Sequence, residues 1–437
     1  MAAPGAFLGG AASRLLPASI PFRFFGAAVA YHLLAWLALL AGADRLPRFA
    51  GGPGWPLAAL HLVTLGVLVM TAIGASLQLL PVATRQPVRR ARWPAAIWWL
   101  YTPGVAGVAL GMGLGAPLVL VAGAAAVVLA LCAYAVLLAS NLRGARGMPG
   151  VVAHGWAALG CLLVVLATAL VLAFGWLGWP GAPRLDRTTA LALHVAFAAY
   201  GFMGLLALGM SYILVPMFAL APTPNARASI VSGVLAVVAL ALAAPAAFGV
   251  APMLLRAAAI AVGNVAVALH LRLMRAALRT GMRRELGRSF TLVRIGWAAL
   301  VASLAAALGL ALDAPLAGLA TLFGLLLVGG WLLSFVLGIL QRILPFLASM
   351  HAAPGSARPP TPSSLSASRP LAIHFHCHVA ALAGLAAAIV ADSAPLAALA
   401  AAIGALGAAA YAAFFVILLH RMRGHTSAAP AAGTRAA

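Results

Sequence analysis

The sequence predicts an all-α membrane protein of about twelve transmembrane helices, and two observations carry that prediction. Of the 437 residues, 65% are hydrophobic and only 7% are charged, whereas a soluble domain usually carries about 25% charged residues. A spanning helix needs roughly 20 apolar residues, and runs of that length recur along the whole chain. We therefore expect a single membrane domain over residues 1–437.

Apolar length and helix-breaking residues define the expected spans in order. In the first half of the chain they are 20–42, 56–82, 94–115, 117–140, 152–177 and 188–221. In the second half they are 228–248, 251–274, 289–312, 317–349, 371–391 and 395–420. Two stretches lie outside them: a flexible cytoplasmic linker at 352–370, rich in Pro and Ser, and a disordered tail at 424–437.

The distribution of arginine gives the expected orientation. The net charge is +22, the chain has no lysine, and most arginines fall in alternate loops. Arg-rich short loops stay in the cytoplasm, so both termini are predicted to be cytoplasmic. The opposite loops carry Asp44, Asp186, Asp313 and Asp392, the first two with arginines nearby. The positive charge is therefore a topology signal, and the predicted partner is the lipid bilayer rather than nucleic acid.

An internal repeat relates spans two, six and ten. Each contains a Gly, six further residues and a Pro, at the cytoplasmic end of a helix that runs from outside to inside. The three segments are Gly74 to Pro81, Gly209 to Pro216 and Gly338 to Pro345. The intervals correspond to four spans each, which predicts three arcs of four helices about a pseudo-threefold axis. The arcs cover about 20–140, 152–274 and 289–420.

Two histidines lie at equivalent places near the outer ends of spans two and six. His61 and His194 come thirteen and fifteen residues before the repeat glycines of their spans. An imidazole inside a bilayer is costly without a partner, so such a residue is a functional-site candidate. A neutral ring nitrogen is a good axial ligand for haem iron; the alternative is a hydrogen bond to a neighbouring helix. His32 and His154 are further candidates within spans.

Span two resembles the second helix of heme-copper oxidase core subunits. In that helix a His near the outer end ligates the low-spin haem, and a Gly, an amide residue and a Pro follow; here His61 and Gln78 stand in the His and amide positions. The span count and threefold arrangement also resemble subunit I of this superfamily. Gly209 to Phe218 and Gly329 to Leu347 are similar to oxidase-subunit-like proteins. The resemblance implies a subunit I-like fold, a haem b cofactor, a bacterial cytoplasmic membrane and a quinone or cytochrome electron donor.

The chain departs from the active oxidases where their chemistry occurs. Residues 317–330 contain no His, although the tenth helix of those enzymes bears two, and residues 228–248 lack the adjacent His residues of a copper B site. Those enzymes also have a cross-linked His and Tyr, and Tyr200, six residues after His194, is not at the spacing of that pair. We therefore expect no copper B and no catalytic residue of that kind. The predicted function is haem binding through His61 and His194, for electron transfer or sensing of a diatomic gas rather than oxygen reduction.

A second histidine group lies at the start of span eleven. His374 and His378 are one helical turn apart, with Cys377 beside them. This set is a candidate transition-metal site, completed by His351 or His420 from neighbouring span ends. The alternative interpretation is that these histidines are exposed to water at the start of the helix.

Two other classes of function stay open. A haem-free transporter or channel would use Asn264, Gln78, Gln341 and Arg294 along a polar path, and a cofactor-less assembly subunit would keep only the fold. Proton pumping is disfavoured, because membrane relays commonly use buried carboxylates and the only Glu, Glu285, lies in a predicted loop. Depth in the membrane distinguishes the haem protein from the transporter. Haem ligands lie together near the outer face, whereas the polar residues of a substrate path are spread across the membrane.

Overall fold

Twelve helices of the computed structural model are long and apolar enough to cross a membrane. The structure describes residues 16–88, 92–179, 185–352 and 360–427. In the first half the elements are α2 (Ser19–Ala41), α3 (Trp55–His61), η2 (Leu62–Val69), α4 (Met70–Ala83), α5 (Trp93–Gly113), α6 (Pro117–Arg143), α7 (Pro149–Leu177), α8 (Arg187–Val195), η3 (Ala196–Gly204) and α9 (Leu205–Ala219). In the second half they are α10 (Ala226–Ala247), α11 (Pro252–Thr280), α12 (Gly287–Ala311), α13 (Leu319–Gly324), η4 (Leu325–Leu333), α14 (Ser334–Ala352), α15 (Pro362–Leu365), α16 (Ser368–Val390) and α17 (Ala394–Ser427).

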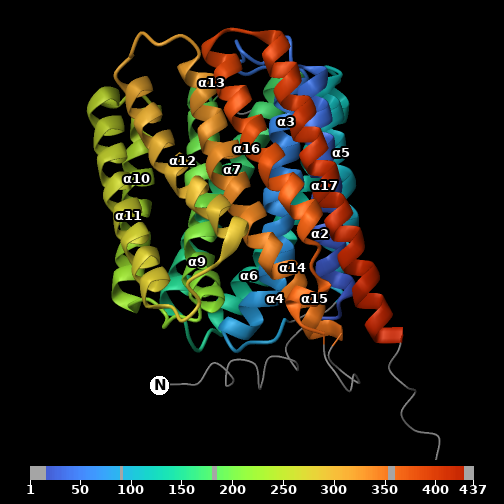
Figure 1. The fold of residues 1–437 in the computed structure, drawn as a ribbon. Coiled ribbons are helices and arrows are strands. Elements are labelled where there is room, and N and C mark those ends of the chain that lie inside the picture. Colours follow the sequence, from blue (N-terminus) through green and yellow to red (C-terminus); the bar gives the residue numbers. More distant parts are fainter. Residues whose placement is uncertain (1–15, 89–91, 180–184, 353–359, 428–437) are drawn as a thin grey trace, which may run out of the picture.

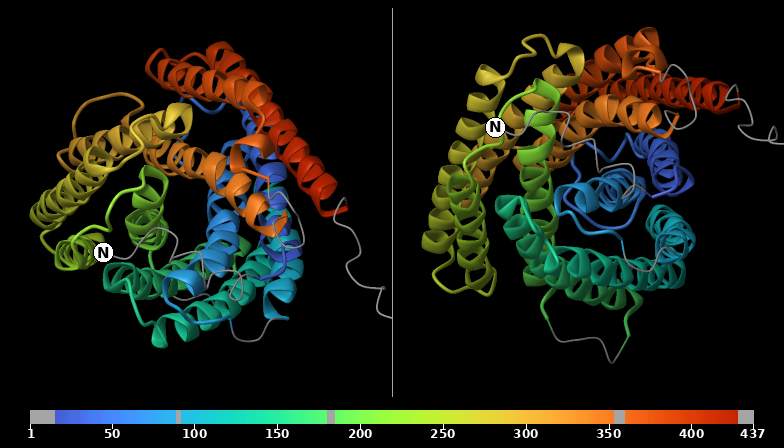
Figure 2. Two further views of the ribbon diagram at one scale, coloured as in Figure 1. Left: turned by 60° about the horizontal axis from the view of Figure 1, so that its bottom comes forward. Right: turned by 90° about the horizontal axis from the view of Figure 1, so that it is seen from below.

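Three spans form the centre of the bundle. Spans two, six and ten, which run through α3–η2–α4, α8–η3–α9 and α13–η4–α14, are the most buried of the twelve. The other helices surround them in chain order, so that the last helix, α17, packs against the first, α2 (Figure 2). The predicted arrangement of an all-α bundle with three internal repeats is therefore confirmed.

The central spans share a pair of glycines eight residues apart, and both glycines of each pair contact the first helix of the same arc. A Cβ added at Gly338 would lie 2.5 Å from the backbone oxygen of Ser289 on α12, and one at Gly209 would lie 2.7 Å from the Cβ of His154 on α7. The three pairs are Gly66 and Gly74, Gly201 and Gly209, and Gly330 and Gly338. Only a residue without a side chain permits this close approach of two helices.

Each central span also contains a π-helical segment. These segments are η2, η3 and η4, of eight or nine residues, and each begins twelve or thirteen residues before the repeat glycine of its span. A π-helix has a wider turn than an α-helix, is rare, and is frequent at functional sites. The π segment occurs at the same place in all three central spans. This local structure is therefore a feature that the three arcs have in common.

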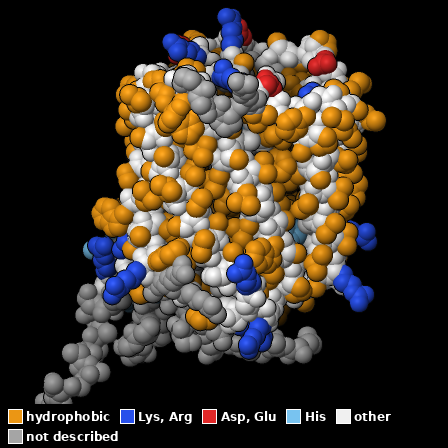
Figure 3. Space-filling view, turned by 180° about the vertical axis from the view of Figure 1, so that it is seen from behind, with side chains coloured by type: hydrophobic (Ala, Val, Ile, Leu, Met, Phe, Trp, Pro, Cys, Tyr) orange, Lys and Arg blue, Asp and Glu red, His pale blue; other side chains and the backbone are white. Residues whose placement is uncertain are grey.

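Charged side chains gather at the two ends of the bundle. The start of α2 and the end of α17 lie at the same end, the lower one in Figure 1, and hydrophobic side chains cover the flank between the charged ends (Figure 3). The loops at the other end contain Asp44, Asp186, Asp313 and Asp392. This separation matches the loop assignment from the arginine pattern, while the direction of the bundle in the membrane stays a prediction.

Part of the predicted linker is a short helix that packs on the last span. Within α15, Leu365 is fully buried, and the Arg421 guanidinium donates to the carbonyl oxygens of Ser364, at 3.2 Å, and Ser366. Residues 353–359 lie outside the described residues. At the C-terminus, α17 continues to Ser427, beyond the expected end of span twelve, and 428–437 likewise lie outside the described residues.

An exposed ion pair joins the loop after α2 to the turn between α16 and α17. The Arg48 Nε donates to both carboxylate oxygens of Asp392, at 3.0 and 2.8 Å, and Nη2 contacts the second oxygen as well. Hydrogen bonding to Arg48 lowers the pKa of Asp392 below its ordinary value. The pair connects the first arc to the last at the end of the bundle opposite the start of α2.

We expect Gly338→Ala to destabilise the protein by about 1–3 kcal/mol, the usual effect of overpacking. The added Cβ would meet a backbone oxygen, which cannot move aside as a flexible side chain can. Gly160→Ala is the matched control, because it lies in a helix with nothing within 4 Å of its added Cβ. Thermal unfolding in detergent measures both variants, and equal midpoints would contradict the close-contact role.

We expect Asp392→Asn to lower the unfolding temperature at pH 7 and to lose this effect in acid. A depressed carboxyl pKa contributes stability above the unfolded value of about 4, and that contribution is lost as the pH falls through the folded value. Asp313→Asn is the control, since Asp313 has no ion-pair partner among the described residues and shares the positive φ of Asp392. A deficit for Asp392→Asn that persists at pH 2 would exclude the ion pair as its cause.

Candidate functional site

His61 is the last residue of α3, directly before the π segment η2. Its Nδ1 lies 3.0 Å from the carbonyl oxygen of Leu57. A carbonyl oxygen only accepts, so Nδ1 carries the proton and donates, and Nε2 keeps its lone pair. The ring is half-buried. This tautomer and the hydrogen bond on the opposite nitrogen are the arrangement that orients a metal-ligating histidine.

His194 has the same arrangement on the equivalent span. It is the penultimate residue of α8, just before η3. Its Nδ1 is 3.2 Å from the hydroxyl oxygen of Thr168 on α7. That hydroxyl donates its own proton to the carbonyl oxygens of Val164, at 2.8 Å, and Val165, at 3.1 Å. With the hydroxyl proton directed at these carbonyl oxygens, Nδ1–H of His194 is the donor to Thr168, and Nε2 of His194 keeps a lone pair.

The outer ends of the central spans are loosely packed around these rings. Residues 194–198 and 321–326 are all half-buried, as are His61 and most of the residues up to Leu65, although they belong to the centre of the bundle. The same helices become fully buried at 66–71, 201–209 and 330–335. Half-exposure on every face of a central helix indicates space beside it. The third central span contributes no His to this region, as the sequence indicates.

The structure brings His374 and His378 together, with ring centroids 5.6 Å apart, but leaves the residues between them outside the core. His374 and His378 are fully buried, which is inconsistent with water-exposed positions at the start of the helix, whereas His376 is exposed on the outer face of α16 and Cys377 is half-buried. Among the described residues, no three His, Cys, Asp or Glu side chains are placed to hold a metal ion. The predicted metal site at His374, Cys377 and His378 stays a prediction.

Neither of the two extra ligands proposed for that group joins it. The Nε2 of His351 lies 3.3 Å from the amide nitrogen of Gln78, and its ring contacts Phe22, whereas His420 is exposed. The buried atoms Gln78 Oε1 and Gln341 Nε2 have no hydrogen-bond partner among the described residues.

The sequence did not single out His270, which the structure buries in the second arc. Its Nδ1 is 3.1 Å from the hydroxyl of Tyr212 on α9, and the Tyr212 ring also packs against His154 at 5.3 Å between centroids. Both histidines keep an unpaired Nε2. An intramembrane histidine is a signal that sequence alone provides, and it would have identified His270.

Two residues of the proposed transporter path face outwards. Asn264 is exposed on α11 and its amide donates to the carbonyl oxygen of Ile260 in its own helix, at 2.9 Å. Arg294 is exposed on α12. A path through the protein needs residues that line the interior, so these two are wrong as lining residues, while Gln78 and Gln341 are buried.

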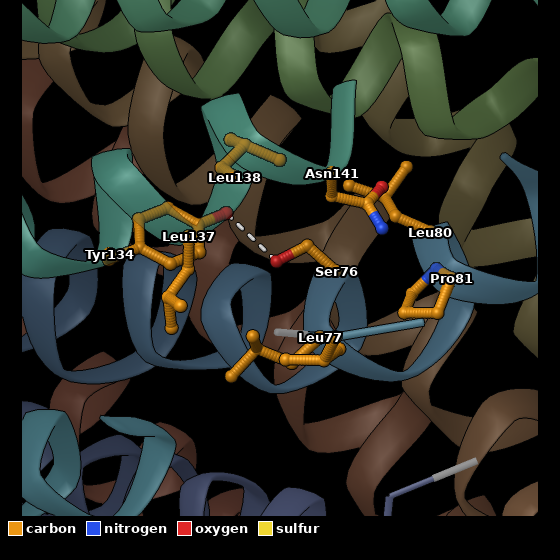
Figure 4. A pocket seen from close by; sticks show the side chains of 9 residues that line it. Ser76, Leu77, Leu80, Pro81, Tyr134, Leu137, Leu138 and Asn141 are labelled. Carbon is orange, nitrogen blue, oxygen red and sulfur yellow. Dashed lines mark hydrogen bonds between the residues drawn. The ribbon is translucent and has the colours of Figure 1, made fainter. Parts of the chain in front are cut away.

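An apolar pocket of about 60 Å³ lies between the three central spans. Apolar side chains from all three spans line it, and Thr71 and Ser76 are the polar side chains among the described residues of its lining. A second pocket of about 20 Å³ lies between α4 and α6 (Figure 4). There Ser76 and Tyr134 bond to one another at 2.8 Å, and Asn141 bonds to Thr84 at 3.0 Å, so these polar groups satisfy each other and serve structure.

Fold and site together define an all-helical membrane protein of three four-helix arcs, with a histidine before the π segment of two of its central spans. Among solved structures the chain is similar to one in the cryo-EM structure of a heme-copper terminal oxidase dimer. The TM-score is 0.63 and the identity 12%, over 95% of this chain and 85% of that one. No family model and no curated protein matches the sequence. The protein thus has the predicted fold of heme-copper oxidase subunit I, and the likeness extends to the fold alone.

Proposed function

We propose that the chain binds a b-type haem between the outer ends of spans two and six, with His61 and His194 as its axial ligands. One observation carries the proposal. Nδ1 of each ring has a hydrogen-bond partner, Leu57 for His61 and Thr168 for His194, so Nε2 of each ring is the nitrogen that would bind iron. The loosely packed outer ends of the central spans supply the space that a haem requires.

The chemistry of two histidine ligands favours electron transfer over catalysis. A haem supplies a one-electron couple when bound, and two axial imidazoles occupy both faces of its iron. His61 and His194 would hold the group, Leu57 and Thr168 would fix the ring orientations, and the apolar side chains nearby would exclude water. Sensing of a diatomic gas requires that one of the two ligands be displaced. A quinone or a cytochrome is the class of donor that suits a site near the outer face of a bacterial cytoplasmic membrane.

We expect a reduced-minus-oxidised absorbance spectrum of the purified protein to show the α and Soret bands of a b-type haem, with iron in equal amount. His61→Ala and His194→Ala should each remove the low-spin spectrum, since each deletes an axial ligand. The control is His376→Ala, which alters an exposed histidine and should leave the bands unchanged. A colourless, iron-free protein from haem-replete cells would exclude the haem and favour the transporter or assembly-subunit classes.

We expect Thr168→Val to weaken haem binding by about 10–100-fold, the usual effect of losing a group that orients a metal-ligating histidine. The substitution keeps the shape of the side chain and removes the acceptor of the His194 Nδ1 proton. Haem titration of the apoprotein measures the affinity. Thr280→Val serves as control, because Thr280 bonds only to its own helix backbone. Unaltered affinity in Thr168→Val would mean that His194 is not the second ligand.

A further inference from the structure

The helices α11 and α12 meet at the end of the bundle where α2 starts (Figure 1), and arginines surround their junction. Six exposed side chains form what we call the junction surface: Arg272, Arg275, Arg279, Arg283, Arg288 and Arg294. Glu285 is the acidic residue of this region, and the other four acidic residues of the chain lie in loops at the opposite end. Among the described residues no ion pair involves any of the six arginines. The junction surface is therefore strongly positive and has no counter-charge from the chain.

Two of these arginines lie within the spans rather than in the loop. Arg272 is eight residues before the end of α11, and Arg294 is seven residues after the start of α12, so each lies roughly 10–12 Å along its helix from the junction. Both are exposed on the flank of the bundle, and α11 is among the least buried of the spans. Arginines in loops carry the topology signal, which does not account for charges at these two places. A charge there is costly unless the long side chain reaches polar headgroups.

A seventh arginine reaches the junction from the third central span. The side chain of Arg342 on α14 is half-buried. Its Nε donates to the hydroxyl oxygen of Ser289 at 2.8 Å, and its Nη2 donates to the carbonyl oxygen of Leu286. Both partners are neutral, and Nη1 has no hydrogen-bond partner among the described residues. Because a partly desolvated charge is costly without an opposite charge, the open edge of this guanidinium suits an anion.

The place of the junction surface selects the kind of anion. Guanidinium groups bind phosphate oxygens in pairs of parallel hydrogen bonds. A soluble phosphate would meet the arginines of the loop, whereas Arg272 and Arg294 lie on the flank that lipid covers. The phosphate of a phospholipid is within reach of both sets. A lipid with net negative charge supplies the counter-charge that the chain lacks here, and a zwitterionic lipid does not.

We propose that the junction surface binds anionic phospholipids of the adjacent leaflet through their phosphate groups. Arg272 and Arg294 contact the headgroups from the flank, and Arg342 adds its open guanidinium edge on the side of the central span. Because α11 ends the second arc and α12 begins the third, bound lipid neutralises the repulsion between arginines where two arcs meet. The proposal does not depend on haem.

The lipid is identified by native mass spectrometry of the full chain, extracted from vesicles with equal amounts of phosphatidylglycerol and phosphatidylcholine. We expect phosphatidylglycerol to be retained in excess. Arg272→Gln and Arg294→Gln should each lower the ratio of retained phosphatidylglycerol to phosphatidylcholine by roughly fivefold, the usual contribution of one arginine at an anionic surface. The matched control is Arg146→Gln, which removes an exposed charge between α6 and α7 and should leave the ratio unchanged. Equal retention of both lipids, or an equal loss in the control, would overturn the proposal.

The role of Arg342 and the source of the phosphate are tested by thermal unfolding in nanodiscs. We expect a higher midpoint in phosphatidylglycerol than in phosphatidylcholine, and a smaller difference in Arg342→Gln but not in Arg146→Gln. General destabilisation by a substitution lowers both midpoints alike, so the difference reports lipid binding. A full difference in Arg342→Gln would exclude Arg342 from the site. Inorganic phosphate added to phosphatidylcholine nanodiscs should not raise the midpoint; a rise that Arg272→Gln abolishes would assign the site to a soluble anion instead.

Discussion

In each arc the first helix contacts the central helix at two glycines eight residues apart. This contact positions the central helices, and with them His61 and His194 of the candidate site. Lipid offers no hydrophobic force between helices, so close packing of small residues carries much of their association. A Cβ added at any of these glycines would lie 2.5–3.0 Å from an atom of the facing helix. The first glycine of each pair lies inside the π segment and the second lies beyond its inner end, so the two contacts together fix the rotation of the central span.

That fixed rotation places His61 and His194 at equivalent positions on their spans. Each lies at the outer start of a π segment, whose wider turn changes the direction of the side chains that follow. The third central span has the same glycines and the same π segment but no histidine there. The fold therefore has three equivalent places, and among the described residues only the first two of them carry a histidine.

The spans and the repeat could be predicted from sequence because apolar length and the Gly-to-Pro spacing are local signals. The π segments could not, since nothing in composition distinguishes η2 or η4 from an α-helix. Burial within a span depends on how the helix is rotated, which the sequence does not show. For this reason His374 and His378 could be interpreted as exposed to water although they are buried. For the same reason Asn264 was assigned to a polar path although it faces outwards. His61 and His194 could be identified because the sequence shows both their residue type and their place in a span. The same signal was present for His270, whereas Tyr411 gains interest only from its neighbours on other helices.

The closing of the bundle by its last helix has a consequence for the order of assembly. His32 enters the membrane with the first helix, whereas the rings that surround it belong to the last two helices, and Trp36 packs against Gly404 of α17. The His32 ring is therefore sheltered from lipid only when α16 and α17 have packed against α2, so burial of this imidazole depends on the closing of the ring of helices.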